Sequence, residues 1–244
     1  MDIKNGRTVK GTCFEQLRDA GNPVELAKLY AEQGADELVF LDITATIENR
    51  STLLHMVEDI ATVINIPFTV GGGINNVANA RELVAAGADK ISINSAAVQR
   101  PQLVNEIAAE LGSQCVVLAI DTKFEQHEWI VYVHGGRTPT SLRTTEWAQQ
   151  AEALGAGEIL LTSMNNDGVK NGYALDITSA VSNAVNIPVI ASGGAGTTAH
   201  FKAVFEQTGA SAALAASIFH FGEIAIPDLK QYLHNEQIPV RWNT

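Results

Sequence analysis

Two aspartates could carry acid–base chemistry in this sequence. Asp2 stands in the initial Met-Asp-Ile-Lys, and Asp121 ends the apolar segment Cys-Val-Val-Leu-Ala-Ile-Asp. Paired carboxylates can act as general acid and general base when their environments separate their pKa values. Either aspartate taken alone is better explained as a cap of the loop that follows it. The catalytic interpretation is favoured because both lie at matching positions of an internal repeat.

Two glycine-rich segments suggest binding of anions. Each glycine-rich segment has a counterpart, the end of the next predicted strand, which carries a serine. The pairs are Gly71-Gly72-Gly73 with Asn94-Ser95, and Ser192-Gly193-Gly194-Ala195-Gly196 with Ala216-Ser217. Glycine lets an anion approach the bare backbone amides, and the start of a following helix adds partial positive charge. One such segment is usually only a tight turn. Two of them, with two aspartates between, predict a substrate phosphorylated at both ends that exchanges protons in its middle.

The repeat itself has a nearly constant offset. Four matches to later segments are shifted by 121 or 122 residues: Gly34–Leu38 to Gly155–Ile159, Asn65–Pro67 to Asn186–Pro188, Gly72-Gly73 to Gly193-Gly194, and Ser95 to Ser217. Asp2 and Asp121 differ by 119. We therefore predict one domain over residues 1–244, made of two half-barrels at about 1–120 and 121–244.

Short apolar segments alternate with amphipathic ones along the chain. The predicted strands are 37–43, 67–70, 90–94, 115–121, 158–163, 188–191 and 212–216. The predicted helices are 24–34, 53–64, 77–87, 102–112, 142–155, 177–185, 199–209 and 227–233, several of which end at glycine. This alternation predicts a parallel sheet covered by helices, and the repeat favours a closed (β/α)8 barrel over an open sheet. Residues 129–133 are expected to form part of an inserted hairpin.

Composition excludes several classes of protein. Acidic residues number 27 and basic ones 16, which disfavours nucleic-acid binding. No apolar segment approaches the roughly 20 residues of a membrane span, and the polar start does not resemble a signal peptide. Two cysteines form no disulfide framework, so a cytoplasmic location is expected. The six histidines lack metal-ligand spacing, and neither a metal nor a cofactor is predicted.

Longer segments resemble the HisF family, the cyclase subunits of imidazole glycerol phosphate synthase in histidine biosynthesis. The resemblance rests on DIKNGRTVKG, GADELVFLDITAT, FTVGGGI, GADKISINSAAV, GSQCVVLAID, HGGR, GAGEILLTSM, DGVKNGY, IPVIASGGAG and AALAASIFHFGEI. It implies a (β/α)8 barrel that takes ammonia from a glutaminase partner at its N-terminal face. The implied substrate is a bisphosphorylated formimino aminoimidazole carboxamide ribonucleotide, split into imidazole glycerol phosphate and aminoimidazole carboxamide ribonucleotide.

The resemblance also implies roles for individual residues. Asp2 and Asp121 match the acid–base pair. Implied phosphate or substrate contacts are Lys10, Gly73, Asn94, Ser95, Asp167, Gly168, Gly194, Ala216 and Ser217, and Thr162 joins them from its place after a predicted strand. Glu37, Lys90 and Glu158 match a charged gate for ammonia, although solvated or mutually paired charges at strand starts would look the same.

One element falls short of the family pattern. Only Met1 precedes Asp2, whereas a full strand precedes Asp121. We therefore expect a truncated first strand, without the fourth gate residue (an arginine) and with an open wall. Two other functions stay open: the related isomerase of the same pathway, and a truncated barrel that binds phosphate or a partner without turnover.

Overall fold

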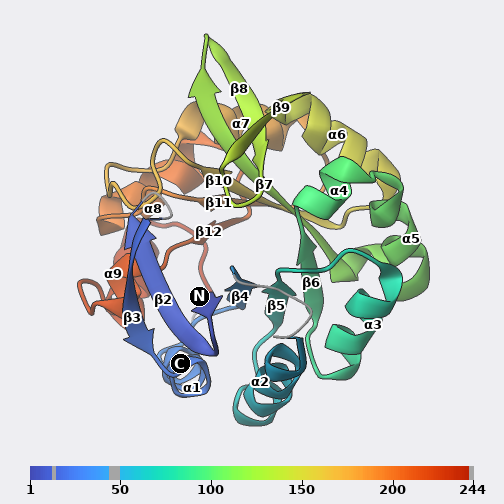
Figure 1. Ribbon diagram of the computed structural model, residues 1–244. Coiled ribbons are helices and arrows are strands. Elements are labelled where there is room, and N and C mark those ends of the chain that lie inside the picture. Colours follow the sequence, from blue (N-terminus) through green and yellow to red (C-terminus); the bar gives the residue numbers. More distant parts are fainter. Residues whose placement is uncertain (13–14, 44–49, 242–244) are drawn as a thin grey trace.

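The computed structural model describes residues 1–12, 15–43 and 50–241. Parallel strands stand around a central axis, and helices surround them (Figure 1). The strands are β1 (Asp2–Lys4), β2 (Arg7–Thr12), β3 (Glu15–Gly21), β4 (Leu38–Asp42), β5 (Phe68–Gly71), β6 (Lys90–Ile93), β7 (Val116–Glu125), β8 (Glu128–Val133), β9 (Thr138–Arg143), β10 (Glu158–Ser163), β11 (Val189–Ser192) and β12 (Ala212–Leu214). The helices are α1 (Pro23–Glu32), α2 (Arg50–Val63), α3 (Val77–Ala85), α4 (Ser95–Gln99), α5 (Gln102–Leu111), the 3₁₀ helix η2 (Ser113–Cys115), α6 (Thr144–Leu154), α7 (Leu175–Ala184), α8 (Thr198–Gln207), α9 (Ser217–His220) and α10 (Ile226–Asn235).

The strand order confirms the predicted α/β barrel class. It runs β12-β11-β10-β7-β6-β5-β4-β1, and every neighbouring pair in this series is parallel. Strands β5 and β11 are buried along their whole length, because helices cover one face and the barrel interior fills the other. Among the described residues, β12 and β1 do not pair with each other. The wall between them is therefore incomplete.

Strand register follows the internal repeat. Asp2 lies opposite Leu41 of β4, and Asp121 lies opposite Thr162 of β10. Leu41 and Thr162 are themselves 121 residues apart. The pairing of β5 with β6 likewise matches that of β11 with β12, residue for residue. Such agreement is what two half-barrels of common design produce.

The helix ends follow local sequence signals. The side chain of Asn22 accepts hydrogen bonds from the amides of Val24 and Glu25, and Pro23 occupies the first turn of α1. Gly155, at a φ of 105°, ends α6 in a left-handed conformation. The side chain of Trp147 anchors α6 against the sheet at 1% exposure. Because caps and terminal glycines mark where helices begin and end, the amphipathic segments that end at glycine predicted the helices well.

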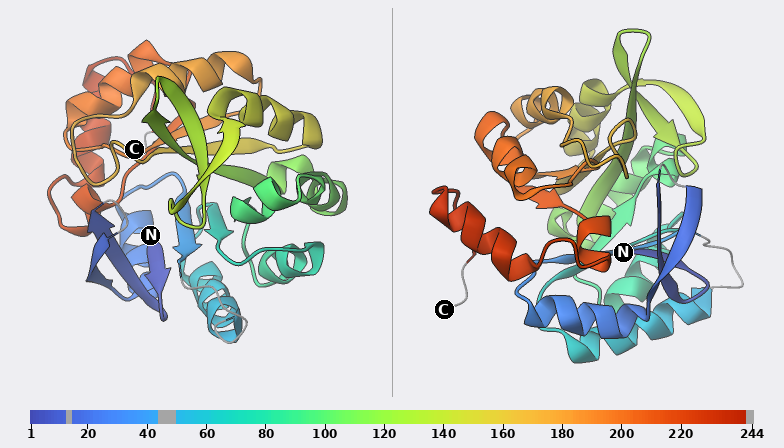
Figure 2. Two further views of the ribbon diagram at one scale, coloured as in Figure 1. Left: turned by 45° about the horizontal axis from the view of Figure 1, so that its top comes forward. Right: turned by 90° about the vertical axis from the view of Figure 1, so that its left-hand side faces the viewer.

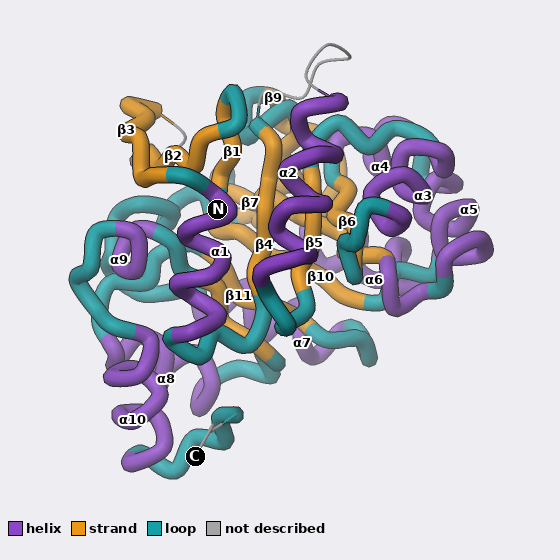
Figure 3. The backbone as a smooth tube through the Cα atoms, turned by 90° about the horizontal axis from the view of Figure 1, so that it is seen from below, coloured by secondary structure: helices purple, strands orange, loops and turns teal. Residues whose placement is uncertain are grey.

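Each half carries a β-hairpin after its first strand (Figures 1 and 2). The expected hairpin around residues 129–133 is confirmed as β8 and β9. The β2–β3 hairpin was not predicted, because its segments are polar and lack an apolar alternation. It lies at one end of the barrel, and α10 lies at the other (Figure 3).

The hairpins correct the predicted position of Asp2. We expected Asp2 to end the first strand, but it is the first residue of β1, which continues to Lys4. The strand continues because β2 pairs with it in antiparallel fashion, with Lys4 opposite Arg7. Asp121 likewise lies inside β7, which runs on to Glu125 against β8. Both aspartates therefore occupy points where a strand leaves its parallel neighbours and enters a hairpin.

The core forms two layers on either side of the sheet. The main cluster packs the sheet against the helices, and a smaller cluster fills the barrel interior around Val117, Leu160 and Ile190. None of the helices in the described ranges combines the length and apolar character needed to cross a bilayer.

Candidate active site

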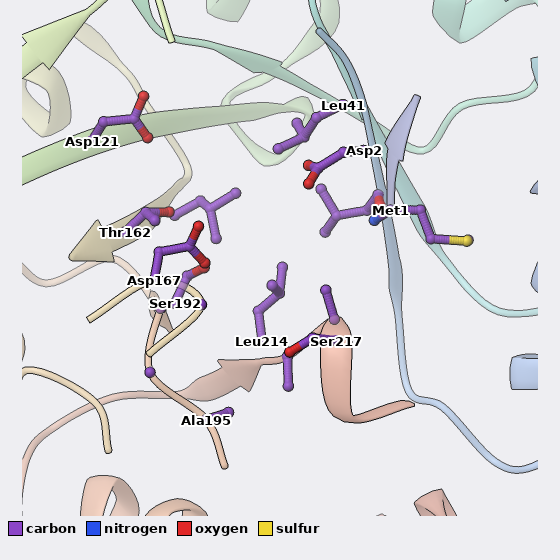
Figure 4. Close-up of a pocket in the computed structure, with 17 residues that line it drawn as sticks. Met1, Asp2, Leu41, Asp121, Thr162, Asp167, Ser192, Ala195, Leu214 and Ser217 are labelled. Carbon is purple, nitrogen blue, oxygen red and sulfur yellow. Dashed lines mark hydrogen bonds between the residues drawn. The ribbon is translucent and has the colours of Figure 1, made fainter. Parts of the chain in front are cut away.

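A cavity of about 80 Å³ opens at the carboxyl ends of the strands. Asp2 and Asp121 both line it, and Figure 4 shows their carboxylates on facing sides. Their strands hold them there, because β1 and β7 present these residues at equivalent register positions. The predicted pair therefore shares one cavity.

The surroundings of Asp121 favour its protonated form. The pKa of Asp121 is raised to about 7, chiefly by burial and also by the charges of Asp167 and Asp2, while a hydrogen bond from Asn94 opposes the increase. The amide Nδ2 of Asn94 donates to Asp121 Oδ2 at 3.0 Å. A carboxyl group with a pKa near neutrality can both give and take a proton at the pH of the cell.

A third carboxylate, that of Asp167, faces the same cavity (Figure 4). Its backbone amide donates to Ser163 O at 2.9 Å, so the loop after β10 holds it in place. A carboxylate repels phosphate and suits a hydroxyl or amino group of a substrate instead. Thr162, opposite Asp121 in β10, adds a hydroxyl to this lining.

The glycines after β5 and β11 are required by backbone packing. A Cβ on Gly72 would lie 2.2 Å from Asp42 O, and one on Gly193 would lie 2.6 Å from Ser163 O. Both glycines have positive φ, of 106° and 88°. Asp42 and Ser163 are again 121 residues apart, so each half uses glycine to cross the end of an equivalent strand. At Gly193 this close crossing also brings bare backbone to the wall of the cavity.

One of the two predicted anion sites surrounds the cavity. Its predicted members line the wall together with both aspartates: Gly168, Gly194, Ala216 and Ser217. Ser217 begins α9, and its side chain points toward the cavity from the side opposite Asp121 (Figure 4).

The other predicted site is not gathered in that cavity. Gly73 is exposed on its loop, and Ser95 Oγ accepts a hydrogen bond from the amide of His134 at 2.8 Å. Asn94, expected at a phosphate, instead donates to Asp121, so in this structure it is a partner of the catalytic candidate. Lys10 belongs to β2, and its side chain lies outside the described part of the chain.

The three predicted gate residues lie together at the opposite end of the strands. Lys90 Nζ is 2.9 Å from Glu37 and 3.0 Å from Glu158. Burial opposes the charge of Lys90, but hydrogen bonds to both glutamates raise its pKa overall. Burial raises the pKa of Glu158, whereas Lys90 lowers it. The cluster is therefore a partly buried ion triad rather than three solvated charges.

Ser192, predicted as part of the second glycine-rich segment, ends β11 and lines the cavity. Sequence reasoning missed one contact of this site. The contact between Asn94 and Asp121 spans 27 residues, and no local pattern announces it. Among the described residues, no group of three His, Cys, Asp or Glu side chains is placed to hold a metal ion.

Comparisons with known proteins agree with this arrangement. A family model described as "Histidine biosynthesis protein" matches residues 1–225. Three curated relatives named "Imidazole glycerol phosphate synthase subunit HisF" align over 241 residues, which is 99% of this chain and 96% of each relative. They come from Parabacteroides distasonis (56% identical), Flavobacterium johnsoniae (58%) and Pyrococcus furiosus (57%). The chain therefore belongs to the HisF family of imidazole glycerol phosphate synthase subunits.

Proposed function

We propose that this chain is the ammonia-dependent cyclase of histidine biosynthesis. It converts a bisphosphorylated formimino aminoimidazole carboxamide ribonucleotide and ammonia into imidazole glycerol phosphate and aminoimidazole carboxamide ribonucleotide. The observation that carries this proposal is the placement of Asp2 and Asp121 on facing sides of one cavity, beside the loops after β11 and β12.

The two aspartates divide the proton transfers. Because its pKa is raised to about 7, Asp121 can both take up and release a proton near neutral pH. Asp2 faces it across the cavity and serves as the complementary base or acid. Ring closure and cleavage of the substrate need both kinds of transfer, and such groups typically contribute about 10²–10⁴-fold each.

The phosphates are held at the two ends of the mouth. One is bound by the backbone around Gly194, Ala216 and Ser217, which line the cavity. The other lies near Gly73 and Ser95, across the barrel, with Lys10 as a further charge partner. The carboxylate of Asp167 accepts a hydrogen bond from a hydroxyl or amino group of the substrate, between the two phosphates. A long ligand with an anion at each end fits this spacing.

A partner subunit supplies the ammonia. The curated relatives are named as subunits of a synthase, so a second subunit belongs to their assembly. We assign a glutaminase to this role, docked where Glu37, Lys90 and Glu158 gather at the amino ends of the strands. Ammonia then passes the ion triad and travels through the barrel to the mouth. A cytoplasmic location stays a prediction from sequence.

An assay with ammonium chloride in place of the partner tests the proposal. The chain is incubated with the formimino ribonucleotide, and release of aminoimidazole carboxamide ribonucleotide is measured. Asp121→Asn should lower the rate by about 10²–10⁴-fold, because the amide cannot exchange a proton. Asp59→Asn, on the exposed face of α2, is the control and should leave the rate unchanged.

The same assay separates the alternatives. An isomerase would rearrange its own substrate without consuming ammonia. A barrel that only binds would show phosphate-competitive binding of the ribonucleotide and no turnover. Equal rates for Asp121→Asn and the parent chain would contradict the assigned acid–base role.

A further inference from the structure

A histidine contacts the end of the second glycine-rich loop, outside the cavity described above. His200 belongs to the first turn of α8, and its Nδ1 atom accepts hydrogen bonds from the backbone amides of Gly196 at 3.1 Å and Thr197 at 3.2 Å. An imidazole nitrogen accepts a hydrogen bond only when it carries no proton, so this arrangement requires the neutral ring with its proton on Nε2. One side chain therefore takes both amide protons at the end of the loop.

His200 divides the amides of this loop into two groups. Those of Gly194 and Ala195, which line the cavity between the two aspartates, donate to no acceptor in the part of the chain that the structure describes. Those of Gly196 and Thr197 are occupied by the imidazole. An anion at the cavity wall is therefore met by the first pair of amides and not by the second.

The loop after β10 fixes the same backbone from the other side. The amide of Gly172 donates to Gly194 O at 2.8 Å, and Asn166 Nδ2 donates to Gly172 O at 2.8 Å. Because the carbonyl and the amide of one planar peptide point in opposite directions, the bond to Gly194 O turns the amide of Ala195 away from Gly172. Ala195 itself lies on the side of the cavity opposite Asp121 (Figure 4). The orientation of that donor thus depends on the contacts of the loop.

The His200 ring also packs between these two loops. A Cβ on Gly172 would lie 3.5 Å from the ring, and one on Gly196 would lie 2.3 Å from Lys170 O. The loops after β10 and β11 are therefore in close contact along their length, with the imidazole at the junction. Loss of the acceptor on His200 frees the end of the loop after β11 while the contact at Gly172 remains.

The first half of the barrel offers an internal reference. Asn79 and Asn76 lie 121 residues before His200 and Thr197, respectively. The Asn76 side chain caps α3 by accepting from the amide of Asn79 at 2.9 Å. Within the described ranges, the side chain of Asn79 accepts no hydrogen bond from the loop that precedes it. A helix at this place in the repeat can therefore form without the contact that His200 makes.

We propose that His200 is a positioning residue of the anion site at Gly194 and Ser217. It orders the loop after β11 and leaves the amides of Gly194 and Ala195 for a phosphate of the substrate. This role rests on the phosphate site of the proposed function, and it is tested with inorganic phosphate and not by turnover.

The unaltered chain gives the first test. Inorganic phosphate is titrated into the protein, and amide NMR shifts are followed residue by residue. The amides of Gly194, Ala195 and Ser217 should shift with phosphate, whereas those of Gly196 and Thr197 should change little. Nitrogen spectra of the imidazole should show an unprotonated Nδ1 of His200 both with and without phosphate.

Two substitutions at position 200 separate the acceptor from the volume of the side chain. His200→Leu keeps apolar volume beside Gly172 but accepts no hydrogen bond, so the apparent Kd for phosphate at Gly194 should rise about tenfold. His200→Gln should return it to within about twofold of the parent, because glutamine at the third helical position accepts from the N-cap amide in a capping box. Rescue by glutamine distinguishes the acceptor from general packing.

Asn76→Ala is the matched control for the loss of a helix cap. It removes the side-chain cap of α3, which should lower the melting temperature by roughly 2–4 °C. The Kd for phosphate at Gly194 should stay that of the parent chain. A weaker site in His200→Leu alone is then not explained by lower stability.

Several results would overturn the proposal. Shifts at Gly196 and Thr197 as large as those at Gly194 would mean that the anion displaces His200. An unchanged Kd in His200→Leu, or no recovery in His200→Gln, would remove its positioning role. If His200→Leu does not fold, the titration of the unaltered chain still decides.

The outcome can be told apart from that of the cyclase assay. No phosphate binding at Gly194 in the parent chain would reject both the role of His200 and the phosphate site of the proposed function. Phosphate binding that depends on His200, in a chain without ammonia-dependent turnover, would reject the proposed function alone.

Discussion

The two halves of this barrel share strand register but differ in burial. In the second half, β7 lies between two parallel neighbours and is buried from Val116 to Leu118. In the first half, the equivalent space beside β4 is a groove of about 430 Å³ between β4 and β12. Strands β6 and β12 have matching pairings to their preceding strands, yet three residues of β6 are buried, and all of β12 is only half-buried. Burial is therefore set by the neighbouring strand and not by the segment's own sequence alone.

The same difference reaches the two aspartates. Asp121 belongs to the complete wall, receives the Asn94 hydrogen bond, and has its pKa raised by burial. Asp2 lies next to the groove, which shares the lining residues Met1, Val39 and Leu214 with the cavity between the two aspartates. A chemically symmetric pair thus sits in two different environments, which is the condition for separate acid and base roles.

The largest expected effect compares two interior leucines. Leu160 of β10 is 2% exposed between two strands, whereas Leu214 of β12 is half-buried at the groove. Leu160→Ala should lower the free energy of unfolding by about 2–5 kcal/mol, and Leu214→Ala by about 1 kcal/mol or less. Urea denaturation followed by circular dichroism measures both. Equal losses would show that the wall at β12 is as well packed as that at β10.

Asp121→Asn should stabilise the protein in a pH-dependent way. The folded state binds the Asp121 proton with a pKa of about 7 instead of the ordinary 3.8, so its stability falls as pH rises through that window. The asparagine variant lacks this loss and should be more stable at pH 8 by roughly 2–4 kcal/mol, with no gain below pH 4. Melting curves at pH 4, 6 and 8 decide the point. A pH-independent gain would mean that Asp121 is not desolvated.

Asn94→Ala should move the pH dependence of activity. The Asn94 amide stabilises the ionised form of Asp121, so its removal raises the pKa of that carboxyl above about 7. We expect the limb of the pH–rate profile that reports Asp121 to move to higher pH, with about a tenfold change in rate at pH 7. Asn94→Asp serves as the contrasting variant, since a second carboxylate should raise that pKa further. A uniform loss at every pH would indicate misplacement of substrate instead.

The two hairpins offer a matched test with smaller effects. Thr144 Oγ1, buried beneath β8 and β9, hydrogen-bonds Thr122 Oγ1 and the carbonyl of Trp129. The hydroxyl of Thr8 in β2 is equally buried but has no hydrogen-bond partner within the described ranges. Thr144→Val should cost about 1–2 kcal/mol, whereas Thr8→Val should be neutral or stabilising. A loss in Thr8→Val would reveal a bonded partner and contradict the difference between the hairpins.

Much of the fold was predictable because its signals are local. Apolar segments gave the strands β4 to β7 and β10 to β12, and terminal glycines gave most helix ends, within a few residues. The repeat identified equivalent segments of the two halves, and in the structure Leu41 and Thr162, which are 121 residues apart, lie opposite Asp2 and Asp121. The β2–β3 hairpin was not predicted, because its two segments lack the alternation of apolar and polar residues that marks a strand. It is held in the fold by the pairing of β2 with β1.

The sequence predicted those residues of the site whose type and position in the repeat indicate chemistry, but not the contacts between them. Asp2, Asp121 and the Gly194 loop stood out by their places in the repeat, and the structure brings them to one cavity. The amide of Asn94 turns to Asp121 because strands β6 and β7 are neighbours, which no local pattern encodes. Likewise, charged strand starts give no sign that Lys90 bridges two glutamates. Which side chains hydrogen-bond or form ion pairs therefore depends on which strands are neighbours in the folded sheet.

The smallest effects should come from the ion pairs at the hairpin surfaces. Arg7 pairs with Asp19 across β2 and β3, and Arg143 pairs with Glu128 across β8 and β9, all with side chains 44–56% exposed. Because water screens such pairs, Arg7→Ala and Arg143→Ala should each shift the melting temperature by less than about 2 °C. Repeating the melts in 1 M sodium chloride should abolish even that shift, since the Debye length falls to roughly 3 Å. A larger loss confined to Arg7→Ala would mean that the β2–β3 hairpin, which lacks the buried threonine contact of its counterpart, depends on its surface pair for stability.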